Sequence, residues 1–204
     1  MDVVIEQIAS SEDLAAMLEV WKQVFEYEMG ITLASDAATS THTVSHLLAR
    51  LGPSGPAVGT LGVFDTSSEQ ELHESLGLKF DRQSRVARFM HLAVLKPYRG
   101  MNIPLMMMLE AHRTVIVPRQ FDYTWLLFDV EKAARSFLSR QLGFKPLPQT
   151  FVSEYGCRCP LVREEHTPEA ELFIQQAERY LKRRESVYAL TGVPPAGATL
   201  SLMS

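Results

Sequence analysis

The feature that most constrains the fold is a long apolar segment that leads directly into a helix. The segment "SRVARFMHLAVL" (84–95) ends in nearly continuous apolar residues, which is typical of a buried central strand. "KPYRGMNIP" follows it, and the methionine-rich "LMMMLEAHR" continues as a helix to residue 113. A helix N-terminus has unpaired backbone N–H groups and a partial positive charge, so this junction is a predicted site for an anion such as phosphate.

Three residues of this junction fit an anion site. Arg99 adds a permanent positive charge, and Gly100 lets the backbone approach a ligand closely. Pro104 is compatible with the first helical turn, because the N–H that it lacks has no partner inside the helix at that position. The alternative is that the segment only caps the helix, and these residues do not separate the two interpretations.

The other segments alternate between strand and helix patterns, which indicates a mixed α/β domain. Further strands are predicted over 2–9, 57–65, 121–130 and 149–162, the last with a bend at Gly156. Helices are predicted over 10–29, 43–52, 131–144 and 167–190, and residues 33–43 have the composition of a loop. We expect one domain over residues 1–190 and a flexible tail over 191–204.

Composition excludes several classes of protein. The chain has 204 residues, of which 46% are hydrophobic and 22% charged, which is ordinary for one globular domain. A net charge of -4 argues against a nucleic-acid binder, no apolar run is long enough to span a membrane, and the N-terminus lacks the basic region of a signal peptide. Cys157 and Cys159 do not form a zinc site by themselves. These observations predict a cytoplasmic protein with reduced cysteines and without a metal.

The junction also resembles a known motif. The run "LAVLKPYRGMNIPLMMMLEAH" is similar to the acyl-CoA signature of the GCN5-related N-acyltransferase superfamily. In that signature an apolar-Ala-Val strand precedes Pro-x-Tyr-Arg-Gly-x-Gly-x-Gly/Ala and a helix. "AVGTLGVF" and "AARSFLSRQLGF" resemble two further segments of the superfamily, in the same order. The resemblance implies an α/β (α+β) fold with a central mixed, mostly antiparallel twisted sheet flanked by helices.

The resemblance implies an enzyme that transfers an acyl group from a thioester to an amine acceptor. The donor would be acyl-CoA or the acyl-phosphopantetheine of an acyl carrier protein. By position, Leu92 and Val94 would contact the pantetheine arm. The pyrophosphate would lie on the turn formed by Arg99, Gly100, Met101, Asn102, Ile103 and Pro104.

Two residues of the turn depart from the superfamily pattern. Asn102 replaces a glycine, and Pro104 replaces a small residue and removes one amide that could bind phosphate. Asn tolerates the left-handed backbone that glycine would adopt. Three interpretations stay open: weaker pyrophosphate binding, a carrier-protein donor with a single phosphate, and a turn that no longer binds a donor.

The front half resembles a narrower group. "WKQVFEYEMGITLASD" and "SHLLARLGPSGPAVGTLGV" are similar to a pattern shared by autoinducer synthases, long-chain N-acyl amino acid synthases and some acetyltransferases. Glu28, Asp36 and His46 match this pattern. The resemblance favours a medium or long acyl chain, and the methionines Met101, Met106, Met107 and Met108 either line an acyl channel or pack in the core. An acetyl-CoA-dependent N-acetyltransferase of a small molecule or protein and a non-catalytic binding protein are the alternatives.

Three residues are candidates for catalysis. Arg88 occupies the position where the superfamily often has a glutamate base. His91 is therefore the candidate to accept a proton from the amine or to guide the amine. The alternative is that His91 is a wall residue of the site without a catalytic role. Ser139 replaces a tyrosine that often protonates the leaving thiolate, and it equally fits a helix surface. Asp129 ends a strand, where it could face the amine or cap the next element.

Basic residues near the predicted donor edge suggest a partner. They could attract an acidic carrier protein or a nucleotide phosphate, or they could form a solvated surface. They are Lys96, Arg99, Arg113, Arg119, Lys132, Arg135 and Arg140. A homodimer is also compatible with the sequence, and neither the acceptor amine nor the acyl length is defined by it.

Overall fold

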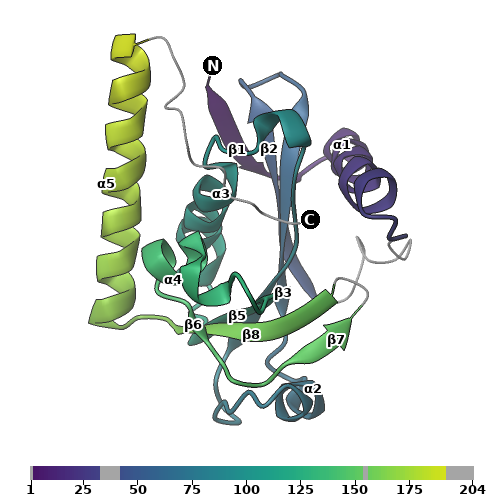
Figure 1. The fold of residues 1–204 in the computed structure, drawn as a ribbon, viewed down its shortest axis with the longest axis vertical. Coiled ribbons are helices and arrows are strands. Elements are labelled where there is room, and N and C mark those ends of the chain that lie inside the picture. Colours follow the sequence, from purple (N-terminus) through teal and green to yellow (C-terminus); the bar gives the residue numbers. More distant parts are fainter. Residues whose placement is uncertain (1, 33–41, 154–155, 192–204) are drawn as a thin grey trace.

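One mixed sheet forms the centre of the molecule (Figure 1). The computed structural model describes residues 2–32, 42–153 and 156–191, with only the backbone described for 184–191. The strand order is β1-β2-β3-β4-β5-β8-β6, and β7 pairs with β8. All pairs are antiparallel except β4 with β5, which is parallel. The strands are β1 (Val3–Gln7), β2 (Thr43–Leu51), β3 (Ala57–Asp65), β4 (Val86–Val94), β5 (Tyr123–Asp129), β6 (Lys145–Pro146), β7 (Phe151–Ser153) and β8 (Gly156–Glu164).

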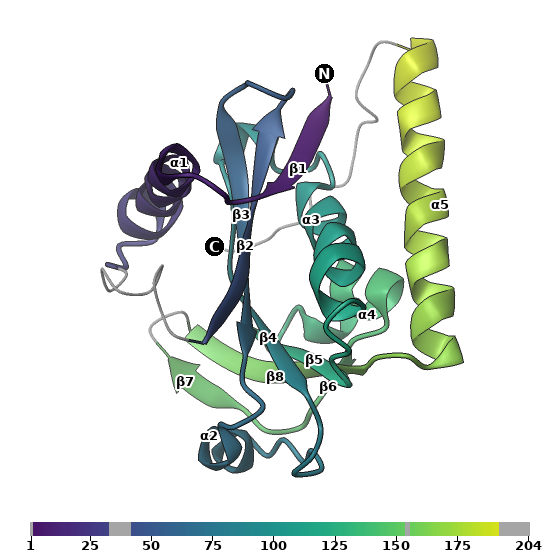
Figure 2. The same cartoon turned by 180° about the vertical axis from the view of Figure 1, so that it is seen from behind.

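Helices cover both faces of this sheet (Figures 1 and 2). On one face α1 (Ser11–Trp21) continues as the π-helix η1 (Lys22–Glu28). On the other face α3 (Ile103–Ala111) continues as η3 (His112–Ile116), and α5 (Pro168–Thr191) lies outside it next to α4 (Phe137–Leu142). The short elements are α2 (Gln70–Ser75), η2 (Lys96–Tyr98) and η4 (Ala133–Arg135). The mixed, mostly antiparallel sheet flanked by helices is therefore confirmed.

The methionine-rich helix α3 is buried on nearly all sides. Its residues Met107 and Met108 are 0% and 2% exposed and belong to the core that the sheet shares with α4 and α5. Met101 is partly buried against the same core. Core packing therefore accounts for these three methionines. Among the described residues, no helix is both long and apolar enough to cross a membrane.

The predicted helix over 43–52 is wrong, because these residues form β2. β2 lies between β1 and β3 and is covered on both faces. Leu48 packs in the cluster under α1, whereas Leu47 and Ala49 pack in the core under α3. A strand that is buried on both faces has a continuous apolar run, and such a run does not differ in pattern from a short buried helix.

Other predicted boundaries need smaller corrections. The helix predicted over 10–29 starts with a capping box between Ser10 and Asp13 and changes to a π-helix after Trp21. The helix predicted over 131–144 is two pieces, η4 and α4, because Ser136 is extended and caps α4. The strand predicted over 149–162 with a bend at Gly156 is two strands, β7 and β8, which pair antiparallel. Most of the predicted loop over 33–43, and the predicted tail from 192 on, lie outside the described residues.

Candidate functional site

The sheet opens between β4 and β5. The two strands pair only from Val86 with Tyr123 to Arg88 with Trp125. Beyond this point β5 remains paired with β8, and β4 remains paired with β3. Within the described part of the chain, the edge of β4 that faces β5 therefore has no strand partner after Arg88. This edge is the first component of the candidate site.

Leu92 and Val94 present their backbone groups to this open edge. The N–H of Leu95 donates to the carbonyl of Val58 on β3 over 2.9 Å, so Leu95 points to the paired side. Because the peptide groups of successive strand residues alternate between the two edges, those of Leu92 and Val94 point to the opening. The resemblance implied that these two residues are the strand contacts of a ligand, and this role stays a prediction.

A bulge in β4 lies at the same opening. Leu61 of β3 stands opposite two residues of β4, His91 and Leu92, since the flanking pairs are Thr60 with Ala93 and Gly62 with Met90. His91 has a φ of 52°, in the left-handed region. Bulges redirect the backbone and side chains of a strand. Here the bulge brings the Leu92 backbone to the open edge.

Two successive hydrogen bonds, from Trp21 of α1 to Thr60 of β3 and from Thr60 to His91, hold the bulge. The indole Nε1–H of Trp21 donates to Thr60 Oγ1 over 2.9 Å, and that hydroxyl donates to the carbonyl of His91 over 2.9 Å. Trp21 and Thr60 are buried. The sequence prediction missed this role for Thr60, because Thr60 and His91 are 31 residues apart and meet only through the β3–β4 pairing.

The turn after β4 leads into the N-terminus of α3. Gly100 has a φ of 96°, and Asn102 is the N-cap of α3 with a φ of 58° and no side-chain capping bond. Asn102 therefore adopts the left-handed backbone that the sequence allowed. The first N–H groups of α3 have no helical acceptors, and those of Ile103 and Leu105 remain available although Pro104 has none.

Gly59 of β3 brings α3 close to the sheet. A Cβ at this position would lie 3.1 Å from the carbonyl oxygen of Ala93 and 3.1 Å from Cγ2 of Ile103. The absence of a side chain at Gly59 therefore allows the first turn of α3 to pack closely against β3.

The side chain of Arg99 is engaged within the protein. Its Nε donates to the carbonyl of Val94 over 2.9 Å, and its Nη2 lies 2.7 Å from Oε2 of Glu28. Glu28 is the last residue of η1. The guanidinium thus occupies one backbone acceptor of the open edge and joins the turn to the helix on the α1 face.

His91 lies among aromatic rings on the α1 face. Its ring centroid is 4.4 Å from that of Trp21 and 5.6 Å from that of Phe64. Burial, together with the smaller effects of the nearby His46 and Arg88, lowers the pKa of His91 to about 4. His91 Nδ1 is buried and has no hydrogen-bond partner among the described residues. The imidazole is therefore neutral at neutral pH, with one nitrogen able to accept a hydrogen bond.

The pKa of His91 predicts a pH dependence of stability. The unfolded chain binds a proton on His91 near its ordinary pKa of about 6.5, whereas the folded chain does so only near 4. We expect the free energy of unfolding to fall as the pH drops through this window, and to fall less in His91→Asn. Asparagine tolerates the left-handed backbone and does not titrate. Urea unfolding of both proteins across the window measures the difference, and equal slopes would contradict the lowered pKa.

Asp129 and Ser139 lie on the β5 side of the opening and make local contacts. Asp129 Oδ1 accepts from the N–H of Lys132 over 3.2 Å, as a cap of the turn that follows β5. The hydroxyl of Ser139 donates to the carbonyl of Ala133 over 2.8 Å. Their catalytic roles stay predictions, because these contacts are also those of structural caps.

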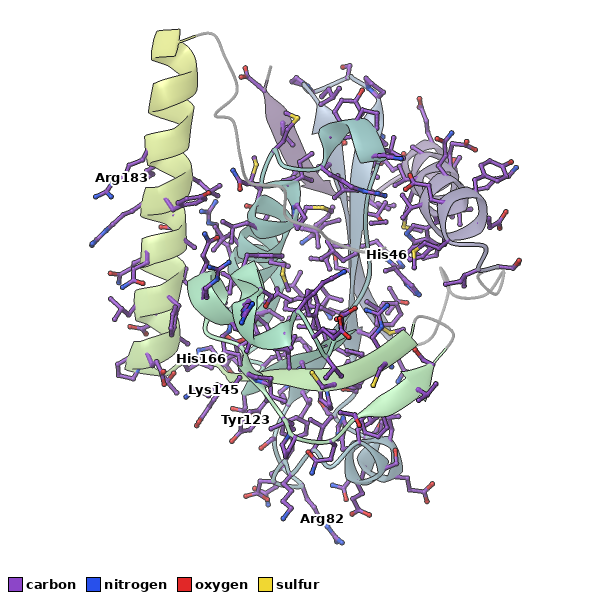
Figure 3. All side chains as sticks on the ribbon, viewed as in Figure 1. His46, Arg82, Tyr123, Lys145, His166 and Arg183 are labelled. Atoms are coloured by element: carbon purple, nitrogen blue, oxygen red, sulfur yellow. The ribbon has the colours of Figure 1, made fainter. Side chains whose placement is uncertain are left out.

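Two adjoining cavities lie at the opposite end of the sheet, where β5 starts and β8 ends. Their volumes are about 300 and 440 Å³. Figure 3 labels Tyr123 and His166 in this region. The shared lining residues are Gln83, Asp122 and His166. Neither cavity includes a predicted site residue, so we place the candidate site at the open edge and the turn, on the basis of backbone geometry. No cluster of three metal-ligating side chains is found among the described residues.

Comparisons with known proteins show the fold. No protein-family model and no curated protein sequence matches the chain. The solved structure of Arabidopsis thaliana NAA60 in complex with acetyl-CoA is 14% identical, with 81% of this chain and 100% of that chain covered and a TM-score of 0.62. FeeM, an N-acyl amino acid synthase from uncultured soil microbes, is 12% identical over 84% of this chain and 98% of its own, with a TM-score of 0.60.

A third similar structure is an acyl-homoserine lactone synthase. BjaI, a CoA-dependent acyl-homoserine lactone synthase solved with SAM and isopentyl-CoA, is 15% identical. The match covers 87% of this chain and 90% of BjaI, with a TM-score of 0.60. At such identities the three matches establish the architecture of the chain, and two of them are synthases of the kinds that the front half resembles.

Proposed function

Because the chain has the fold of the GCN5-related N-acyltransferases, we propose that it is an enzyme that moves an acyl group from a thioester to an amine. The observation that carries the proposal is the open edge of β4, which runs directly into the N-terminus of α3. An extended arm can pair with such an edge while a phosphate lies on the helix N-terminus.

In this proposal the donor lies along β4. Its pantetheine amides pair with the backbone of Leu92 and Val94. Its phosphate lies on the turn from Arg99 to Pro104, where the N–H groups of Gly100, Asn102 and Ile103 provide donors, whereas the N–H of Met101 donates to the carbonyl of Tyr98 over 3.3 Å. Pro104 has no N–H group to donate. The site therefore has one N–H group fewer than it would have with glycine or alanine at position 104.

The reaction needs few side chains, because a thioester is already activated. The amine attacks the carbonyl carbon, the C–N bond forms, and the C–S bond breaks with its electron pair on sulfur. The Leu92 N–H, which the bulge turns to the opening, would polarise the carbonyl. The neutral ring of His91 would accept a hydrogen bond from the amine and guide it, while water takes the proton.

Asp129 and Ser139 complete the proposed site on the β5 side. The carboxylate of Asp129 would attract the incoming ammonium. The hydroxyl of Ser139 would relay a proton through water to the leaving thiolate, as a weak acid that needs a water partner. Asp129 lies at the end of the opening at which β4 leads into the turn, since it ends β5 and β4 and β5 run parallel.

We favour a medium or long acyl chain and a donor that is either acyl-CoA or an acyl carrier protein. The resemblance of the front half to synthases of acylated products supports the longer chain, and FeeM and BjaI share the fold. An acetyl-CoA-dependent N-acetyltransferase is the second candidate, supported by the similarity to NAA60.

Basic residues beside the opening give a test of the carrier-protein donor. Arg135 and Arg140 are exposed, and neither makes an ion pair with a residue in the described part of the chain. Charge complementarity mainly raises association rates. We expect Arg135→Glu/Arg140→Glu to slow transfer from an acyl carrier protein by about tenfold and from pantetheine-linked donors without a carrier by less than about twofold. An equal loss with both donors would count against carrier docking on this surface.

The experiment that tests the function is amine-dependent release of free thiol. Purified protein is incubated with acetyl-CoA, octanoyl-CoA, palmitoyl-CoA and an acylated carrier protein, each with a panel of amino acids and other amines. We expect thiol release together with an amide product of the corresponding mass. Turnover with acetyl-CoA only would move the conclusion to an acetyltransferase. Donor binding without turnover would indicate a non-catalytic binding protein.

A further inference from the structure

We propose that Glu28 competes with the donor's phosphate groups for Arg99 and thereby limits the affinity for the donor. The proposal rests on the proposed function, because it concerns the same donor site. It assigns Glu28 to the donor side of that site, although Glu28 belongs to the helix on the α1 face.

The contact between the two residues has the geometry of a true ion pair. Arg99 Nη2 and Glu28 Oε2 are 2.7 Å apart, and no other described carboxylate forms an ion pair with Arg99. The side chains of Arg99 and Glu28 are 24% and 30% exposed. Both charges therefore remain in contact with solvent, and an anion that arrives from solvent can reach the guanidinium.

The position of Arg99 makes this pair relevant to the donor. Arg99 directly precedes Gly100 and the N-terminus of α3, where the proposed site holds phosphate. A phosphate at that place and Glu28 would attract the same guanidinium from different sides. Arg99 cannot make its closest contacts with both, so binding of the donor must weaken the pair with Glu28.

The second hydrogen bond of Arg99 links phosphate recognition to the strand edge. Its Nε occupies the carbonyl of Val94, which is one of the backbone acceptors that the pantetheine arm would use. When the guanidinium turns to a phosphate, this carbonyl becomes available. Donors that carry phosphate are therefore favoured over a bare pantetheine arm, and the strength of the Glu28 pair sets how large that preference is.

Removal of the competing charge tests the proposal. In Glu28→Gln we expect CoA to bind about two- to fivefold more tightly, which is the range for one partly exposed ion pair. The gain should be smaller for 4′-phosphopantetheine, absent for pantetheine, and reduced by added salt. Calorimetric titration of the three ligands at low ionic strength gives the dissociation constants. Glu26→Gln is the matched control, because it removes the same charge from the same helix and Glu26 makes no described ion pair with Arg99.

A double-mutant cycle separates competition from a structural effect. In an Arg99→Gln background, Glu28→Gln should leave the affinity for CoA unchanged. An unchanged or weaker affinity in Glu28→Gln, with normal CoA binding by the wild type, overturns this inference and leaves the proposed function in place. An equal gain in Glu26→Gln also overturns it, because the effect would then come from net charge. If neither the wild type nor Glu28→Gln binds any of the three ligands, both the inference and the proposed donor site are wrong.

Discussion

Replacement of Glu165 by alanine is expected to lower the free energy of unfolding by about 3–5 kcal/mol, the largest loss that the structure predicts for a single charged residue. The Glu165 side chain is 0% exposed, and that of Arg163 is 4% exposed. Oε1 of Glu165 accepts from Arg163 Nε over 2.8 Å and also from the hydroxyl of Thr124. Oε2 lies 3.5 Å from His112 Nε2 on η3. Alanine would leave the buried guanidinium of Arg163 without its counter-charge.

A paired substitution controls for this prediction. Arg163→Met/Glu165→Leu removes both charges and keeps apolar volume, so we expect it to cost clearly less than Glu165→Ala. Urea unfolding of the wild type and both variants measures the three values. A loss of less than about 1 kcal/mol for Glu165→Ala, the range of exposed pairs, would contradict the buried network.

The same network gives acid sensitivity with a defined sign. Burial alone would raise the pKa of Glu165, but the contacts with His112, Arg163 and Thr124 outweigh it and lower the pKa. The folded state therefore holds its proton more weakly than the unfolded state does. The stabilisation is present above the unfolded pKa and is lost as the pH falls through the lowered folded value.

Replacement of Gly59 by valine is expected to reduce donor affinity by at least about tenfold and to destabilise the fold by about 1–3 kcal/mol. A Cβ would already stand 3.1 Å from Ile103 Cγ2 and 3.3 Å from Val94 Cγ2, and the two methyl groups of valine need more room. The start of α3 must then move away from β3, which separates the phosphate-binding turn from the strand edge.

A graded series distinguishes the local effect from general unfolding. Gly59→Ala needs a shift of only a few tenths of an ångström, so we expect it to lose affinity to a smaller degree than Gly59→Val. Donor titrations are made at a temperature where circular dichroism shows all three proteins to be folded. Full donor affinity in folded Gly59→Val would exclude a donor site that depends on the contact between β3 and α3.

The part of the site that lies in one continuous segment could be predicted from the sequence. The strand, the turn and α3 are neighbours along the chain, so their order fixes where Leu92, Val94, Gly100 and Asn102 lie relative to one another. The left-handed backbone of Asn102 also follows from local preference. The fold class was predictable for the same reason, because alternating strand and helix patterns leave few architectures.

Contacts between distant segments could not be predicted. The hydrogen bonds that hold the bulge at His91 come from Trp21 and Thr60, and the partner of Arg99 is Glu28, 71 residues away. The pKa of His91 is a related case. The ordinary value of about 6.5 made it a candidate base, but burial lowers it to about 4 and leaves a neutral acceptor. The packing of α1 and η1 against the sheet creates that environment, together with Phe64 of β3.

The most direct test of the central claim is to map the donor site by NMR. Amide chemical shifts of the isotope-labelled protein are followed as CoA is added. We predict that the largest changes occur at the open edge and the turn, from Leu92 to Leu105, with Glu28 changing as its partner moves. Changes confined to the residues around Asp122 and His166, where the cavities lie, or no changes at all, would contradict a donor site between β4 and α3.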